Sequence, residues 1–119
     1  MEGRGPVYVK SFDFALLIIG LYKKLQINCE YIISKQLLRS GTSIGANVNE
    51  ASAAYSRNDF KYKMSVASKE ARETLYWLEL LDESDLVEFN LEKEIKDCDE
   101  LIRLLTAIVK STKNSSLKT

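Results

Sequence analysis

Residues that interrupt helices are scarce in this chain of 119 residues. The only proline is Pro6, and the only glycines beyond residue 5 are Gly20, Gly41 and Gly45. No repeat, low-complexity tract or interdomain linker divides the sequence. Because glycine and proline are the strongest breaks in regular structure, a chain with so few of them, and with apolar residues at helical spacing, is predicted to form one continuous helical domain.

Apolar residues recur every three or four positions in four stretches, as they do in helices that bury one face. We expect helices over about residues 12–26, 30–55, 58–82 and 91–112, followed by a polar tail at 113–119. Ser11, Ser56 and Asn90 stand where they can cap the first, third and fourth helices. Short connections between four amphipathic helices predict an all-α fold, an antiparallel up-and-down four-helix bundle that spans residues 1–119 as a single domain.

The expected core positions repeat at helical spacing along the last three helices. They are Ile33, Leu37, Ile44, Val48, Ala51 and Tyr55 in the second helix, Phe60, Met64, Ala67, Ala71, Leu75, Leu78 and Leu81 in the third, and Leu91, Ile95, Cys98, Ile102, Leu105 and Val109 in the fourth. The steps of four and three in the fourth helix are typical of a bundle seam. Cys98 is therefore expected to fill the core rather than to act as a reactive thiol.

Charge and composition exclude several classes of function. The chain has 17 Lys and Arg against 17 Asp and Glu, so it has no overall attraction to nucleic acid or to an anionic membrane, and either partner would need a local basic patch. It has no histidine, which excludes Ser-His and Cys-His catalysis and the usual zinc and di-iron sites. We predict no cofactor, no metal and no small-molecule substrate.

The N-terminal residues carry no secretory signal, and the longest apolar run, residues 15–22, is too short to cross a bilayer. We therefore expect a cytoplasmic, soluble protein with no membrane partner. Cys29 and Cys98 should stay reduced there, and their separation fits neither a metal site nor a redox motif.

The first helix is apolar almost all the way round. Only Asp13, Gly20 and Lys24 leave a narrow polar stripe on it. A helix of this kind must be covered on more than one side, and in a small bundle another subunit supplies that cover most simply. We predict a homo-oligomer, and the alternative is a monomer that buries this helix deeply.

A polar stripe lies beside the apolar face of the second helix. It consists of Gln36, Ser40, Ser43, Asn47 and Glu50, with Arg39 next to it. Small polar groups beside a packed face indicate close helix contact with hydrogen bonds between helices, here to Glu70 and Glu73. The alternative is a polar pocket or a strip that binds a partner.

Three groups in the third helix have a chemical alternative to a structural role. Glu70 and Glu73 could act in acid–base or metal chemistry, although ion pairs with Arg39, Lys69 or Arg72 explain them more simply. The Tyr76-Trp77 pair fits a core or an interface better than a platform for stacked bases, because it lies inside a helical apolar pattern.

The third group is basic, and its members are Arg57, Lys61, Lys63, Lys69 and Arg72. Lys23 and Lys24 at the end of the first helix are further candidates for binding nucleic acid. Lys61 and Arg72 share one helical face with two serines, so a strip that follows phosphates is geometrically feasible. The alternative is an ordinary solvated surface.

Two sequence blocks carry a resemblance to a known family. The first runs from Gln36 to Ala51 (QLLRSGTSIGANVNEA), and the second is Phe60 followed by the run from Ser68 to Leu81 (SKEARETLYWLELL). With the matching first helix they cover residues 12–84. The chain resembles the bacterial four-helix-bundle family named for 23S rRNA intervening sequences, also called the S23 ribosomal proteins.

The resemblance implies an all-α bundle in a ring-like homo-oligomer, a pentamer, with no enzymatic activity. A similar protein, the accessory factor of diversity-generating retroelements, binds nucleic acid and partners a reverse transcriptase. The motif positions of the family fall on the residues of the predicted polar network, which are Arg39, Ser43, Asn47, Glu50, Glu70 and Glu73.

The functional hypothesis is a non-enzymatic, homo-oligomeric helical adaptor. It would present a repeated basic surface, made by Arg57, Lys61, Lys69 and Arg72, to RNA, DNA or a nucleoprotein partner. The first alternative is a protein–protein interaction scaffold that binds no nucleic acid. An enzyme that uses Glu70 and Glu73 is a more distant one.

Overall fold

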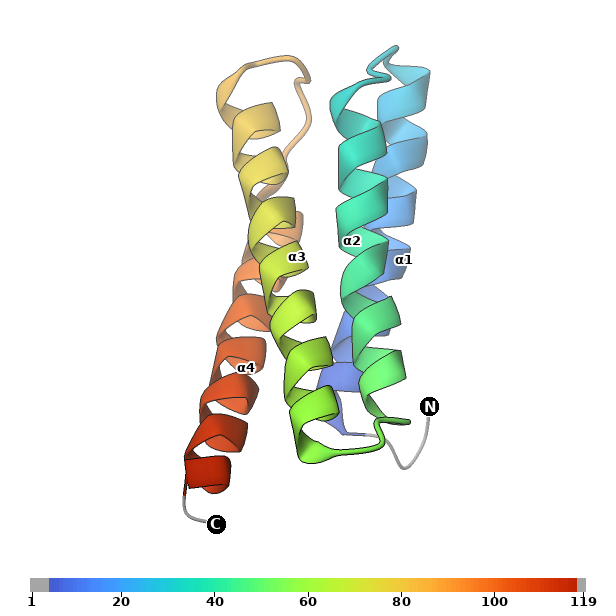
Figure 1. The fold of residues 1–119 in the computed structure, drawn as a ribbon. Coiled ribbons are helices and arrows are strands. Elements are labelled where there is room, and N and C mark those ends of the chain that lie inside the picture. The colour runs from blue at the N-terminus through green and yellow to red at the C-terminus, as the bar shows by residue number, and fades with distance from the viewer. Residues whose placement is uncertain (1–4, 118–119) are drawn as a thin grey trace.

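A computed structural model describes residues 5–117, with side chains described as far as residue 112. It contains four helices in chain order, α1 Pro6–Ile27, α2 Ile33–Ala51, α3 Arg57–Glu83 and α4 Glu92–Leu117, and no strand among the described residues. The helices run up and down in a rod of 52 × 26 × 20 Å (Figure 1). The predicted all-α four-helix bundle is confirmed.

Each helix packs against its neighbours in the sequence, and α1 closes the bundle against α4. The contact between α1 and α4 is the smallest of the four, whereas α2 and α3 share the largest. The bundle therefore consists of two helical hairpins, α1–α2 and α3–α4, joined mainly through α2 and α3 (Figure 1).

The core is formed by aliphatic side chains from all four helices. Ile18 and Leu25 of α1, Leu37 and Ile44 of α2, Leu78 and Leu81 of α3, and Leu101 and Leu105 of α4 are among the largest fully buried side chains. Most expected core positions are buried. Between Ala71 and Leu78 of α3, however, the fully buried residue is Thr74, and the expected Leu75 packs only partly buried against the core. The described residues contain no buried polar side-chain atom without a hydrogen-bond partner.

The predicted start of the first helix is wrong, because α1 begins at Pro6 rather than near residue 12. Pro6 lies in the first turn, where its fixed φ suits a helix and its missing N–H costs no hydrogen bond. Ser11 does not cap the helix but is buried within it, and its hydroxyl donates to the Tyr8 carbonyl at 3.2 Å. Asp13 accordingly lies in the middle of α1.

The predicted bounds of the second helix, 30–55, are too wide at both ends. Glu30 lies before α2, and its carboxylate accepts the N–H groups of Ile33 at 3.0 Å and Ser34 at 2.6 Å. Cys29 has a φ of 61°, which turns the chain between α1 and α2. At the other end α2 stops at Ala51, and Tyr55, expected in the core, is 100% exposed.

The third and fourth helices begin as predicted. Ser56 caps α3 by accepting the N–H of Asp59 at 3.0 Å, and Asn90 accepts the N–H of Glu92 at 2.6 Å at the start of α4. The polar tail expected at 113–119 is helical as far as Leu117, and residues 118–119 lie outside the described residues. The sequence after Gly45 contains no glycine or proline, so nothing in it forces an earlier stop.

Helices α1 and α2 approach each other closely at two glycines of α2. A Cβ atom on Gly41 would lie 2.9 Å from Cγ2 of Ile18, and one on Gly45 would lie 3.2 Å from the Ser11 carbonyl oxygen. Both distances are shorter than ordinary van der Waals contact. The absence of side chains at Gly41 and Gly45 thus allows α1 to pack against the α2 backbone.

Candidate functional site

Arg39, next to the polar stripe of α2, binds two glutamates of α3. Arg39 Nη1 donates to Glu70 Oε2 at 3.2 Å, and Nη2 donates to Glu73 Oε2. The same oxygen of Glu73 also accepts the indole N–H of Trp77 at 2.9 Å. Arg39, Glu70, Glu73 and Trp77 therefore form one connected cluster at the α2–α3 boundary. The Arg39 side chain is 51% exposed, so solvent screens the ion pairs and each contributes modestly to stability.

A buried hydrogen bond lies on the core side of this cluster. The hydroxyls of Ser40 and Thr74, both fully buried, are 2.8 Å apart, and Thr74 Oγ1 is also 2.8 Å from the Glu70 carbonyl oxygen. The Ser40–Thr74 hydrogen bond therefore joins buried polar groups of α2 and α3 directly. Thr74 was not among the predicted residues, although it continues the steps of three and four through Met64, Ala67 and Ala71.

The remaining residues of the predicted network do not join this cluster. Asn47 donates to the Ser43 carbonyl at 2.9 Å and lies 3.2 Å from the Ser43 hydroxyl, so this pair stays within α2. Glu50 accepts from Lys63 Nζ at 2.9 Å, which makes a separate bridge to the start of α3. This hydrogen bond raises the pKa of Lys63, and it turns Lys63 toward α2, away from the other basic residues of α3.

The carboxylates of Glu70 and Glu73 both bind Arg39 in this structure. The described residues contain no group of three or more His, Cys, Asp or Glu side chains that could hold a metal ion. The pair is thus arranged as the anionic side of an ion-pair cluster, and its geometry gives no positive indication of a metal centre or of acid–base chemistry.

The basic residues predicted to bind nucleic acid lie along one side of α3. Lys69 and Arg72 are exposed, Lys61 is half-buried, and Arg57 is exposed at the start of the helix. Arg72 Nη2 donates to Thr106 of α4 at 3.2 Å. A shallow depression lined by Arg57, Phe60, Ser111 and Thr112 places the start of α3 beside the end of α4.

The antiparallel packing of α3 and α4 separates charge along this hairpin. Residues 57–72 hold five Lys and Arg against two acidic residues, whereas residues 79–100 hold ten Asp and Glu against two Lys. From residue 101 to 112, α4 has Arg103 and Lys110 and no acidic residue. The N-terminal half of α3 lies beside the C-terminal half of α4, the segment that contains Arg103 and Lys110 (Figure 1). Arg103 also forms an ion pair with Asp99 at 2.9 Å.

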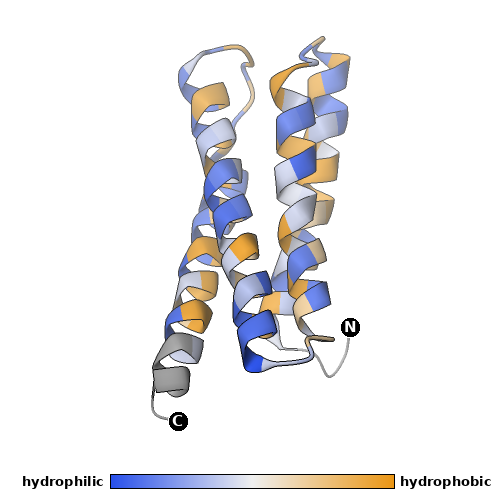
Figure 2. Cartoon of the chain, in the orientation of Figure 1, coloured by the Kyte–Doolittle hydropathy of each residue, from blue (hydrophilic) through white to orange (hydrophobic). Residues whose placement is uncertain are grey.

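Helix dipoles do not explain this arrangement in α3. They favour acidic side chains in the first turn of a helix and basic ones in the last. The first turn of α3 carries Arg57 as well as Asp59, and its last turn carries Asp82 and Glu83 with no basic residue. The side of α3 that faces the viewer in Figure 2 is mostly hydrophilic, and Arg57, Lys69 and Arg72 are exposed.

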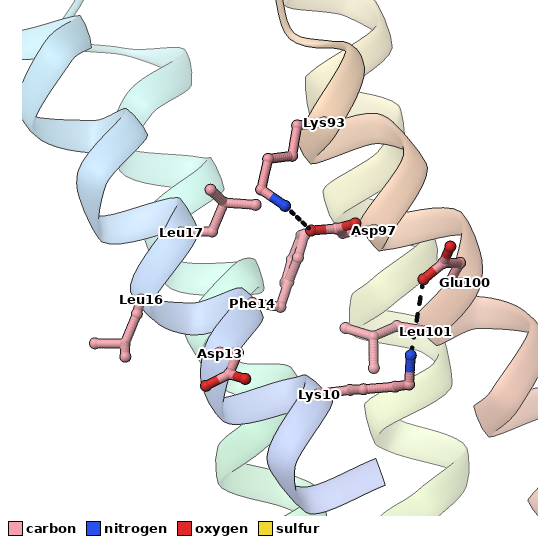
Figure 3. Close-up of a pocket in the computed structure, with 9 residues that line it drawn as sticks. All are labelled: Lys10, Asp13, Phe14, Leu16, Leu17, Lys93, Asp97, Glu100 and Leu101. Carbon is pink, nitrogen blue, oxygen red and sulfur yellow. Dashed lines mark hydrogen bonds and ion pairs between the residues drawn. The ribbon is translucent and has the colours of Figure 1, made fainter. Parts of the chain in front are cut away.

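A second surface lies on α1. Its outer side carries Val9, Phe12 and Leu16, of which Phe12 is 51% and Leu16 54% exposed. Beside this stripe a groove of about 480 Å³ separates α1 from α4. Figure 3 shows Phe14, Leu17 and Leu101 between the two helices, and Leu16 pointing away from α4.

Charged side chains border the groove. Lys10 lies 3.8 Å from Glu100, and Lys93 of α4 lies 3.2 Å from Asp97 (Figure 3). The prediction that α1 is apolar on more than one side agrees with this surface, because α1 buries six residues against the bundle and still leaves large apolar side chains exposed. No helix of the described residues is long and apolar enough to traverse a bilayer.

A comparison of the sequence with models of protein families identifies the family to which the chain belongs. The family model described as 23S rRNA-intervening sequence protein matches residues 5–107, which include α1, α2 and α3 and the greater part of α4. The chain belongs to the 23S rRNA-intervening sequence protein family. The resemblance noted in the sequence is thereby confirmed.

A solved structure places this 23S rRNA-intervening sequence protein among known folds. A crystal structure of a protein of unknown function from the S23 ribosomal protein family of Bacteroides thetaiotaomicron is 48% identical, with a TM-score of 0.83. The match covers 87% of this chain and 98% of that one. No curated protein matches the chain.

Three residues of this 23S rRNA-intervening sequence protein were missed by reasoning from the sequence. Thr74 interrupts an apolar pattern, and the half of α4 that contains Arg103 and Lys110 lies beside the basic half of α3 only because the two helices are antiparallel. Counting charge separately for each half of each helix would have revealed the two basic residues. The zero net charge of the whole chain concealed them.

Proposed function

We propose that this protein is a non-enzymatic, homo-oligomeric adaptor that binds RNA or DNA through a basic surface repeated on each subunit. The surface consists of Arg57, Lys61, Lys69 and Arg72 of α3, extended by Arg103 and Lys110 of α4. The observation that carries the proposal is the charge separation along the α3–α4 hairpin, which concentrates cations at one end of a chain with no net charge. Lysine and arginine bind phosphates without regard to sequence.

Repetition in an oligomer strengthens a modest patch. Two binding events on linked surfaces give a higher overall affinity than either alone, provided that one nucleic acid can reach both. The apolar stripe of α1 lies on a different helix from the basic side of α3, so one surface is available for assembly and the other for a ligand. The family resemblance implies five subunits.

The proposal is tested by binding a labelled RNA and a labelled DNA to the protein at 50 mM and 200 mM salt. We expect retention that falls steeply with salt, because phosphate contacts release counterions. The double variant Lys61→Glu with Arg72→Glu should weaken binding at least tenfold and reduce the salt dependence. Lys35→Glu is the matched control, since Lys35 is exposed on α2 and lies outside the basic surface.

Binding that is independent of salt, or equal in the double variant and the control, contradicts the proposed surface. A measurement of the native mass of each variant must accompany the binding data. Only a variant that keeps the wild-type mass separates loss of the surface from loss of assembly.

The second candidate is a protein–protein interaction scaffold that does not bind nucleic acid. The groove between α1 and α4 supports it, because its apolar floor and charged rim resemble a surface that accepts an amphipathic helix. A pull-down from nuclease-treated lysate distinguishes the two candidates. Protein partners survive the nuclease, whereas partners bridged by nucleic acid are lost.

A further inference from the structure

Two tyrosines stand on the exposed side of α3 without a role in the core. Tyr62 is 63% and Tyr76 is 58% exposed. They are 14 residues apart, close to four complete turns, so they lie on the same side of the helix about 21 Å apart. Of the core or interface that the apolar pattern favoured for Tyr76, the core is therefore wrong, and the interface stays a prediction.

Basic side chains alternate with these tyrosines. Lys69 lies midway between them, seven residues from each, and Arg72 lies one turn before Tyr76. Lys61 is adjacent to Tyr62. The hydrogen bond from Arg72 to Thr106 holds that guanidinium on the α4 side of this surface.

The ring of Tyr76 is also held in place. It makes an edge contact with the Trp77 ring, with centroids 5.2 Å apart and an angle of 70° between the planes. Trp77 is itself tied to Glu73, and Glu73 to Arg39, through the cluster described above. An aromatic side chain that is positioned before binding loses less conformational freedom when a ligand stacks on it.

We propose that unpaired bases of a single-stranded nucleic acid stack on Tyr62 and Tyr76 while its phosphates contact Lys69 and Arg72. This inference rests on the proposed nucleic-acid binding and specifies its ligand. Stacking on tyrosine requires an accessible base face, and the bases of a duplex already stack on one another. A surface that bound only the phosphates of a duplex would need the cations but not the tyrosines.

The test compares the binding of one labelled 20-nucleotide sequence as single-stranded RNA, as single-stranded DNA and as a DNA duplex, followed by fluorescence anisotropy. We expect the wild type to prefer the single strands, and each of Tyr62→Ala and Tyr76→Ala to weaken single-strand binding about fivefold or more. Binding to the duplex and the slope of affinity against salt should change little. The RNA and DNA arms show which single strand is preferred.

Three controls make the test specific. Tyr62→Phe and Tyr76→Phe keep a ring and should retain the wild-type affinity. Tyr31→Ala removes an exposed tyrosine from the turn before α2 and should have no effect. Light scattering should give the same native mass for every variant, since a change in mass would assign the tyrosines to a subunit interface and overturn the inference.

The outcomes separate this inference from the proposed function. If Lys61→Glu with Arg72→Glu weakens binding but the alanine variants do not, stacking is wrong and the basic surface stands. Stacking is equally wrong if the alanine variants weaken duplex and single-strand binding to the same extent. If the wild type binds none of the three oligonucleotides, both proposals fall.

Discussion

Cys98 and Cys29 differ in the properties that control thiol reactivity. Cys98 is fully buried, and its thiol donates to the Ala71 carbonyl at 3.3 Å. Burial, with a smaller effect from Asp99, raises the pKa of Cys98 to about 12. Cys29 is exposed in the turn between α1 and α2. Since the thiolate is the reactive form, the fold protects Cys98 and leaves Cys29 accessible.

Titration of the native protein at pH 8 with a chromogenic disulfide reagent should therefore modify one thiol rapidly, and a second only after denaturation. Cys29→Ser should abolish the rapid reaction. The raised pKa also predicts lower stability in alkali, because between pH 9 and 12 the unfolded chain ionises Cys98 while the folded chain keeps it protonated. Rapid reaction of both thiols in the native protein would contradict the burial of Cys98.

The polar residues show how far residue-level prediction reaches. The spacing of Arg39, Glu70 and Glu73 predicted side chains on facing helices, and they meet in the structure. Ser43 and Asn47 follow Arg39 at steps of four residues along α2, but they form a hydrogen bond with each other within α2. Periodicity gives the face on which a residue lies, whereas its partner depends on side-chain length and on the rotation of the neighbouring helix.

At the scale of the elements, the glycines of α2 decide how closely α1 approaches. We expect Gly45→Val to destabilise the protein by about 1–3 kcal/mol, because the added side chain would overlap the α1 backbone at Ser11. Gly20→Val is the matched control. A Cβ atom there would have no heavy atom within 4 Å, and valine is the better helix former of the two residues.

Thermal unfolding followed by circular dichroism measures both variants. The melting temperature of Gly45→Val should fall by several degrees, and that of Gly20→Val should stay the same or rise. Equal melting temperatures for the two variants would show that the close approach of α1 to α2 does not matter for stability.

The ends of the helices were predicted unevenly, for a physical reason. Ser56 and Asn90 cap their helices with short side chains that accept nearby N–H groups, an arrangement that sequence alone encodes. The start of α1 has a local signal in Pro6 and also depends on packing, and the end of α2 at Ala51 depends on packing. Val7 is buried against the bundle and extends α1 backwards, whereas Tyr55 finds no cover and stays outside.

At the scale of the whole molecule, the exposed apolar stripe of α1 predicts assembly. The wild type should have a native mass of about 68 kDa by light scattering if five copies of the 13.5 kDa chain associate. Phe12→Glu with Leu16→Glu should reduce the mass toward that of the monomer, because charges would be buried at the interface. Leu86→Glu, which changes an exposed leucine in the α3–α4 connection, should not.

A wild-type mass near 13.5 kDa would contradict assembly through α1. An unchanged mass in the double variant would show that the subunit interface lies elsewhere on the molecule. Either result would also weaken the case for nucleic-acid binding, which depends on the repetition of a modest basic surface.

The sequence by itself determined the helices, their apolar faces and the family, because hydrophobic periodicity and local caps are properties of short segments. Because the chain contains no histidine, the sequence also excluded catalysis and metal binding that require histidine. Only the tertiary structure decided that Thr74 bonds Ser40, that α2 glycines contact α1, and that two basic half-helices lie side by side. These features join residues far apart in the chain, and their contacts exist only once the helices have packed with a particular rotation and direction.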